Sequence, residues 1–310
     1  MIVFNYMNEY GGCYPLLLGI IVILIMSLYL PVLAHNFSTN ESAVFLALTD
    51  ALKAEVQLVQ QNLANNSISL ASDHANIALA LLTDDVSNEI AERNQRLSYD
   101  LNTDLASLMA STESASGNNT ASDTDFLVDD INGIVDEIVS ARIDPDQLNN
   151  STTQALRMIE LLDKLLISYG NAYAVGFDMT NMSMMMMGSS NDGMNSMLTT
   201  NMSMGNESGD NMSTGSISMN NNNSASDTSL VNITEYQTAQ AIAMKINEVF
   251  NSQLAGASSA APGQSIDNIA SALQELMTRV DSKASPMNVM TIVHTKVHPN
   301  LLSAFNLNLR

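Results

Sequence analysis

The sequence predicts an all-α protein, an antiparallel bundle of about six helices that carries one disordered insertion. Two observations lead to this prediction. From Glu41 onward the apolar residues recur every three or four positions, which is typical of helices that bury one face. Runs of alternating β-branched residues bounded by turns are not found, so the sequence predicts no sheet. Short connections between such helices favour antiparallel neighbours.

The composition limits the partners of the chain. Its 310 residues hold 32 Asp and Glu against 11 Lys and Arg, a net charge of −21. Nucleic acid is excluded as a partner, because phosphate binding needs clustered basic groups that displace counterions. The single cysteine, Cys13, excludes an intramolecular disulfide.

The first element is a membrane segment. Residues 1–14 form a short start without Lys or Arg, and residues 15–34 are an uncharged apolar run. Its length matches the ~20 residues of a membrane-spanning helix. The sequence before Ala34 resembles a cleavage site, which favours a signal peptide, whereas the long apolar run favours an uncleaved transmembrane anchor. Both alternatives export the body of the protein to the extracytoplasmic side.

Glycosylation motifs agree with export. Twelve Asn-x-Ser/Thr sequons occur in the chain, and all of them follow the apolar run. Each sequon alone is weak in a chain so rich in Asn and Ser. Together with the acidity they indicate an external, glycosylated protein.

Residues 38–176 are predicted to form the first four helices of the bundle. Ser38 and Glu41 are spaced as a capping box that opens the first helix. A long second helix is expected from Leu70 to Met109, and the composition of residues 111–122 predicts a loop.

The third helix is predicted over residues 127–138. Asp144 followed by Pro145 then supplies an N-cap with proline in the first turn, which opens a fourth helix that runs to Tyr169.

Residues 232–310 are predicted to complete the bundle. Thr234 and Gln237 are spaced as a second capping box, and another helix is expected over residues 266–280. A short helical segment follows Ser285 and ends before Pro299. We expect one body, because two helices and a short tail make a marginal core alone.

The methionines are the sharpest chemical signal. Twelve of the 21 lie between Met179 and Met219, inside residues 177–231, which lack helical periodicity and are predicted to be disordered. Thioether sulfur suits Cu(I) and binds without losing a proton. The alternative is a linker whose composition has no metal role. The candidate ligands are Met182, Met184, Met185, Met186, Met187, Met194, Met197, Met202 and Met204.

Two histidines form a second candidate metal site. His294 and His298 are four residues apart, and Met287 and Met290 are expected on the same helical face, a stripe that could hold copper or zinc. Pro299 argues against helical geometry at His298. His74 is predicted to be a satisfied, partly buried histidine.

The sequence predicts no enzyme. It holds no HExxH, no GxSxG and no glycine-rich phosphate loop, and the abundant carboxylates are those of solvated helix faces.

Three stretches resemble a known family. Residues 173–176 (YAVG), residues 231–239 (VNITEYQTA) and residues 286–305 are similar to the extracytoplasmic helical domain of oxidase-dependent iron permeases. The resemblance implies that the methionine segment is an insertion between Gly176 and Asn232. It does not imply transport, because these residues include no multi-pass membrane part.

The remaining body resembles exported helical proteins of ammonia-oxidising archaea, through residues 72–82 and 88–94. Their hosts depend heavily on copper.

The function expected from the sequence is that of an exported, membrane-anchored helical protein that binds or buffers a soft metal through the methionine segment. Copper is the expected metal. The alternative is an acidic, glycosylated structural or interaction protein of the cell envelope, whose bundle binds a protein partner. A weaker third possibility is the sensor domain of a receptor.

Overall fold

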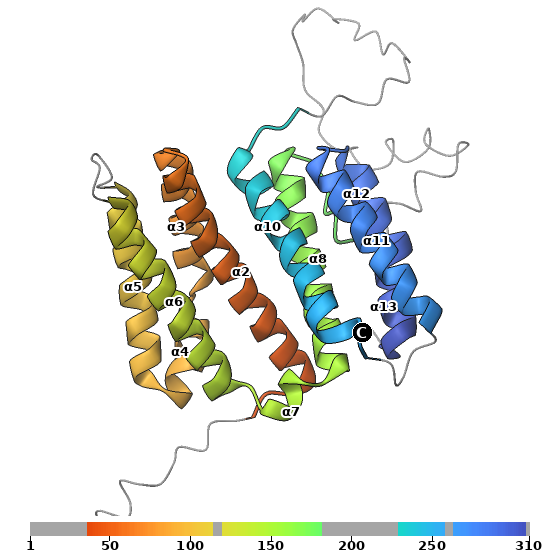
Figure 1. Cartoon of the computed structure of the whole chain (residues 1–310), viewed down its shortest axis with the longest axis horizontal. Coiled ribbons are helices and arrows are strands. Elements are labelled where there is room, and N and C mark those ends of the chain that lie inside the picture. The colour runs from red at the N-terminus through yellow and green to blue at the C-terminus, as the bar shows by residue number, and fades with distance from the viewer. Residues whose placement is uncertain (1–35, 114–119, 182–228, 258–262, 308–310) are drawn as a thin grey trace, which may run out of the picture.

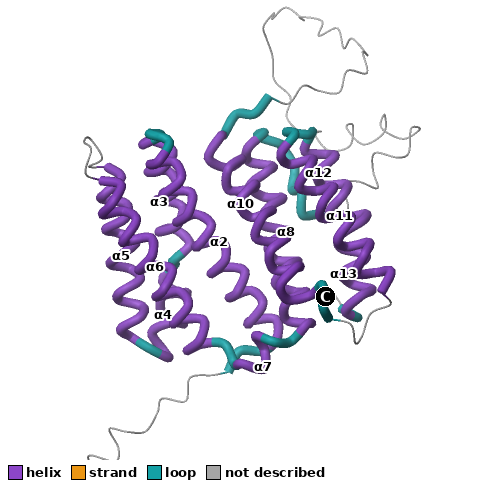
Figure 2. The backbone as a smooth tube through the Cα atoms, viewed as in Figure 1, coloured by secondary structure: helices purple, strands orange, loops and turns teal. Residues whose placement is uncertain are grey.

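The computed structural model describes residues 36–113, 120–181, 229–257 and 263–307. Within these ranges it contains eleven α-helices, two π-helical turns and no strand, which confirms the all-α prediction (Figure 2). The predicted membrane segment, residues 15–34, lies outside the described ranges. Among the helices that are described, none has the length and apolarity needed to cross a membrane.

The first five helices surround one apolar core (Figure 1). The Ser38 capping box is confirmed: the Ser38 N–H donates to Glu41 Oε2 at 2.7 Å, and the Glu41 N–H donates to Ser38 Oγ at 3.3 Å. The helices are α2 (Thr39–Ala64), α3 (Ile68–Leu81), α4 (Asp84–Arg93), α5 (Gln95–Glu113) and α6 (Thr120–Arg142).

The prediction of one long helix from Leu70 to Met109 is wrong, because α3, α4 and α5 occupy this stretch. Thr83 is the N-cap of α4 and accepts a hydrogen bond from the Val86 N–H at 3.3 Å. Asn94 ends α4 in an extended conformation with φ −155°. Short polar side chains compete with the helix for backbone groups, and at these two positions they break it.

The later helices surround a second core. Here the helix predicted from Pro145 stops after one turn, and Asn150 caps a new helix by accepting from the backbone N–H groups of Thr152 and Thr153. The elements are α7 (Pro145–Leu148), α8 (Ser151–Ala172), α10 (Ile233–Val249), the π-helical turn η1 (Phe250–Leu254), α11 (Gly263–Asp281), α12 (Pro286–Ile292), the π-helical turn η2 (Val293–Val297) and α13 (His298–Phe305).

Two further corrections concern helix starts. The N-cap of α10 is Asn232, whose Oδ1 accepts from the Glu235 N–H at 3.2 Å, and not Thr234. The helix also continues through His298 and Pro299, against the prediction. In η2 the His298 N–H bonds to Val293 O, five residues back, and this wider turn accommodates a proline that an α-helical turn would resist.

Helix α2 lies between the two groups of helices and belongs to both (Figure 1). Phe45 and Val56 contribute to the first core, whereas Ala47 contributes to the second. Ala54 and Leu58 pack with Ala241 of α10. A helix that buries apolar residues all around its axis forms only together with its neighbours.

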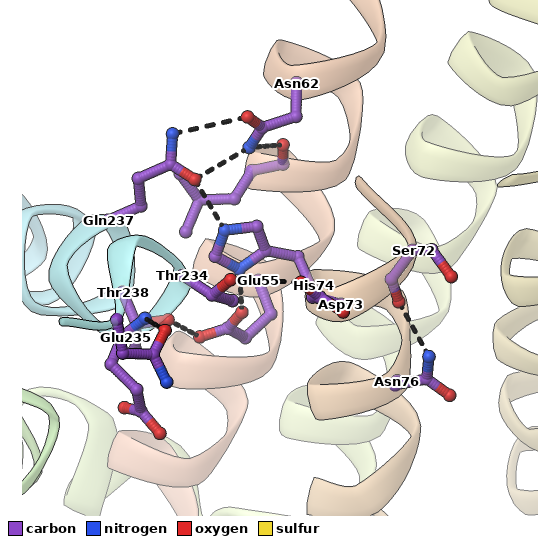
Figure 3. Close-up of polar contacts among 12 residues, drawn as sticks. Glu55, Asn62, Ser72, Asp73, His74, Asn76, Thr234, Glu235, Gln237 and Thr238 are labelled. Atoms are coloured by element: carbon purple, nitrogen blue, oxygen red, sulfur yellow. Dashed lines mark hydrogen bonds and ion pairs between the residues drawn. The ribbon is translucent and has the colours of Figure 1, made fainter. Parts of the chain in front are cut away.

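A buried polar cluster, here called the polar joint, connects α2 and α3 to α10 (Figure 3). His74 is completely buried; its Nδ1 lies 2.7 Å from Glu55 Oε2, and its Nε2–H donates to Gln237 Oε1 at 2.9 Å. The Thr238 hydroxyl donates to Glu55 Oε1 at 2.7 Å. The prediction of a satisfied His74 is confirmed, although the side chain is more deeply buried than expected.

The orientations of the amide and imidazole groups in the polar joint follow from one backbone carbonyl. The Asn62 amide donates to Leu58 O at 2.9 Å, which fixes its nitrogen and its oxygen. Gln237 pairs reciprocally with Asn62 and must therefore present Oε1 to His74. Both ring nitrogens of His74 therefore face oxygen atoms, one of Glu55 and one of Gln237.

A second buried contact joins α2 to α8. The guanidinium of Arg157 donates to both carboxylate oxygens of Asp50, each at 2.6 Å, and Arg157 also contacts Gln154. This bidentate geometry is the strong form of an ion pair.

We predict that His74→Leu lowers the free energy of unfolding by about 3 kcal/mol or more, because it leaves the Glu55 carboxylate buried without its main partner. Lys53→Met is the control, since it breaks the ion pair with the exposed Asp136 and should cost no more than about 1 kcal/mol. Urea unfolding of both variants measures the two values. Equal costs would contradict the role assigned to the polar joint.

Candidate functional site

The nine candidate methionine ligands, Met182 to Met204, lie outside the described residues, but both ends of the methionine segment are described. Its first residues, 177–181, and its last residues, 229–231, belong to the described part of the chain. The N–H groups of Val231 and Asn232 both donate to Ala172 O, at 2.9 and 3.1 Å. The chain therefore leaves α8 and returns to the end of the same helix, a place here called the segment root.

A tight turn directs the outgoing chain at the segment root. The Val175 N–H bonds to Gly170 O at 3.0 Å, and Ala174 takes the left-handed conformation with φ 49°. Asp178 Oδ1 then accepts from the backbone N–H and the hydroxyl of Thr180, at 2.9 and 2.7 Å. These hydrogen bonds from Thr180 lower the pKa of Asp178.

Met179 packs into the bundle and is not positioned as a metal ligand of the methionine segment. It is 2% exposed and belongs to the second core. A Cβ at Gly170 would lie 3.1 Å from Met179 Sδ and 3.0 Å from Val175 Cγ2, so this packing favours a glycine in α8. The sequence interpretation missed both residues, although a glycine inside a helical pattern is a signal of close packing.

The structure brings His294 and His298 together under the segment root. The two rings are 2% and 8% exposed, with centroids 5.3 Å apart and planes at 68°. His294 Nε2–H donates to Met179 O at 2.8 Å. Among the described residues, His294 Nδ1 and His298 Nε2 have no hydrogen-bond partner.

Only one of the two methionines of the predicted stripe is buried. Met290, one turn before His294, is completely buried, whereas Met287 is 47% exposed. The prediction that Met287 shares a face with the buried histidines is therefore wrong. The described residues contain no group of three His, Cys, Asp or Glu that could hold a metal ion.

Burial changes several pKa values in this half of the protein, among them those of His298 and Asp163. It lowers the pKa of His298 to about 4, with a smaller contribution from His294, so the ring is neutral at pH 7. In α8, burial raises the pKa of Asp163 to about 6, and the charges of Glu160 and Asp178 add to this effect.

A groove beside α2 offers no comparable chemistry. It holds about 450 Å³ between α2, α6 and α10. Lys53 and Lys245 line it, but they are paired with Asp136 and Glu248, respectively. The absence of catalytic activity remains a prediction from the sequence.

We predict that Gly170→Ala destabilises the protein by about 1–3 kcal/mol, because the new methyl group meets Val175 and the sulfur of Met179. The matched control is Gly133→Ala in α6, where nothing lies within 4 Å of a new Cβ. This change should stabilise the protein by about 0.5–1 kcal/mol through helix propensity. Thermal unfolding of the two variants should show opposite signs, and a shared sign would contradict the packing described for Met179.

The pH dependence of stability provides a prediction for His298. In the unfolded chain His298 binds a proton below about pH 6.5, whereas in the folded protein it does so only below about pH 4. Between these two pH values the unfolded state binds more protons, so the free energy of unfolding decreases as the pH falls. Asp163 acts oppositely, because its raised pKa makes its contribution more favourable as the pH falls through about 6. The wild-type curve alone therefore mixes two effects.

The comparison with His298→Gln in the presence of a chelator separates them. Relative to wild type, the variant should gain about 2–3 kcal/mol in free energy of unfolding between pH 7 and pH 4. A difference that stays constant with pH would show that His298 is not kept neutral by burial.

No protein-family model, no curated protein and no solved structure matches this chain. The resemblance to iron permeases and to exported archaeal proteins therefore remains a prediction from short sequence stretches. What the chain does has to be inferred from its own residues.

Proposed function

We propose that this chain is an exported, membrane-anchored helical protein that binds or buffers a soft metal through the methionine segment, with copper as Cu(I) the metal it takes. The proposal retains Met182 to Met204 as ligands. One observation carries it: the scaffold holds both ends of this segment at the segment root, beside two buried histidines with unused ring nitrogens.

The anchoring of both ends supports a loop that serves the bundle and does not separate two domains. The entropy of closing a loop grows only with the logarithm of its length, so a long insertion between fixed ends costs little stability. The bundle can thus carry the methionine segment without depending on its sequence. Thioether ligands also suit the extracytoplasmic side, where free thiols oxidise.

The acidity of the protein supports the same proposal. A net charge of −21 gives the surface a negative field, which raises the local concentration of cations. Charge alone favours every cation, and the thioether sulfurs supply the preference for a soft ion.

We predict that replacing Met184, Met185, Met186 and Met187 by Leu lowers Cu(I) binding to the segment by tenfold or more, since a leucine matches methionine in size but has no sulfur. The measurement is a Cu(I) titration of the full chain in detergent, in competition with a chromophoric chelator. The control is Met244→Leu with Met287→Leu, two exposed methionines of the scaffold.

Unchanged affinity in the four-leucine variant would reject the proposed ligands. A wild-type chain that binds no Cu(I) would reject the metal function and leave the alternative, an acidic envelope protein whose bundle binds a partner.

A further inference from the structure

The two buried histidines at the segment root differ from His74, the third histidine in the described part of the chain. His74 has both ring nitrogens within hydrogen-bond distance of oxygen atoms. His294 and His298 each keep one buried nitrogen without a partner. Burying an unsatisfied polar atom costs about 1–3 kcal/mol, so two such atoms on adjacent rings require an explanation.

The hydrogen bond to Met179 defines which atom of His294 is available. Nε2 carries the hydrogen that goes to Met179 O, so in the neutral ring the lone pair is on Nδ1. This is the usual arrangement of a metal-binding histidine, which donates its second nitrogen to a backbone carbonyl or a carboxylate and is thereby held in one tautomer.

The residues around the two histidines indicate which kind of ion fits between them. The described residues offer no third His, Cys, Asp or Glu here, and a structural zinc site needs four such ligands. A divalent ion would also bring two uncompensated charges into a buried place. A monovalent soft ion that accepts few ligands fits better, and the buried Met290, one turn before His294, adds a thioether.

The helix itself is unusual at this position. His294 lies in η2 and His298 follows it directly, so the pair occupies a π-helical turn and its exit. Such turns are rare and occur frequently at functional sites, because the extra residue changes the direction of side chains.

From these observations we propose that His294 Nδ1 and His298 Nε2, with the Met290 sulfur as a third ligand, form a buried Cu(I) site separate from the methionine segment. The choice of copper rests on the proposed function, whereas the position of the site rests on the geometry of the two rings. The hydrogen bond from His294 to the Met179 carbonyl connects this site to the described first residues of the methionine segment.

The test uses four forms of the full chain in detergent. They are the wild type, a nine-Gln variant in which the nine candidate methionine ligands are changed to Gln, a variant with His294→Gln and His298→Gln, and a combined variant with all eleven changes. Glutamine at 294 retains a donor for Met179 O. Each form is titrated with Cu(I) against a chromophoric chelator. Far-UV circular dichroism and the urea midpoint establish that each form is folded.

The expected result is one Cu(I) per chain in the nine-Gln variant and none in the combined variant. Met290→Leu in the nine-Gln background should weaken the remaining site about tenfold, whereas Met287→Leu, an exposed change in the same helix, should not alter it. X-ray absorption of the nine-Gln form should show two nitrogen ligands and at most one sulfur.

Three results would overturn the inference. A folded nine-Gln variant that binds no Cu(I) excludes the buried site while leaving the segment function intact. Binding that survives in the combined variant assigns the ion to other residues. Zinc binding at this site without Cu(I) binding rejects the choice of ion. Conversely, a histidine-dependent site in a chain whose segment binds nothing would reject the proposed function and retain this one.

Discussion

The fold depends on one helix that cannot be given to either core alone. Helix α2 contributes apolar side chains to both cores, and it also buries three of its polar side chains that bind other helices. Asp50, Glu55 and Asn62 are therefore committed to partners on α8, α3 and α10. Because buried charges are stable only when paired, these contacts define one relative position of the two groups of helices, which a purely apolar surface would leave less determined.

The sequence predicted most of the helices, but it did not predict where a long helical stretch is broken into shorter helices. Apolar periodicity predicted α2, α6, α8, α10 and α11 because a repeated pattern over several turns is a strong signal. The breaks at Thr83, Asn94 and Asn150 depend on single polar side chains that are equally compatible with a helix surface. The continuation through Pro299 depends on a change in helix type that no residue pattern announces.

The candidate site was also predictable only in part, because local spacing can be read from the sequence and long-range packing cannot. The spacing of His294 and His298 pointed to a pair, and their burial and orientation followed only from the packing of α8 against α12 and α13. The hydrogen bond to Met179 joins residues 115 positions apart, and the polar joint includes a pair separated by 175. Contacts of this range depend on how whole helices pack, so local sequence cannot indicate which of three similar histidines is satisfied.

The order of the elements along the chain has a consequence for the biosynthesis of this protein. Helix α8 presents its apolar face to α10, yet about 60 residues separate the end of one from the start of the other. At a ribosomal rate of ~5–20 residues per second, α10 is synthesised several seconds after α8. The residues of α8 that α10 covers in the folded protein lack this cover throughout the synthesis of the methionine segment.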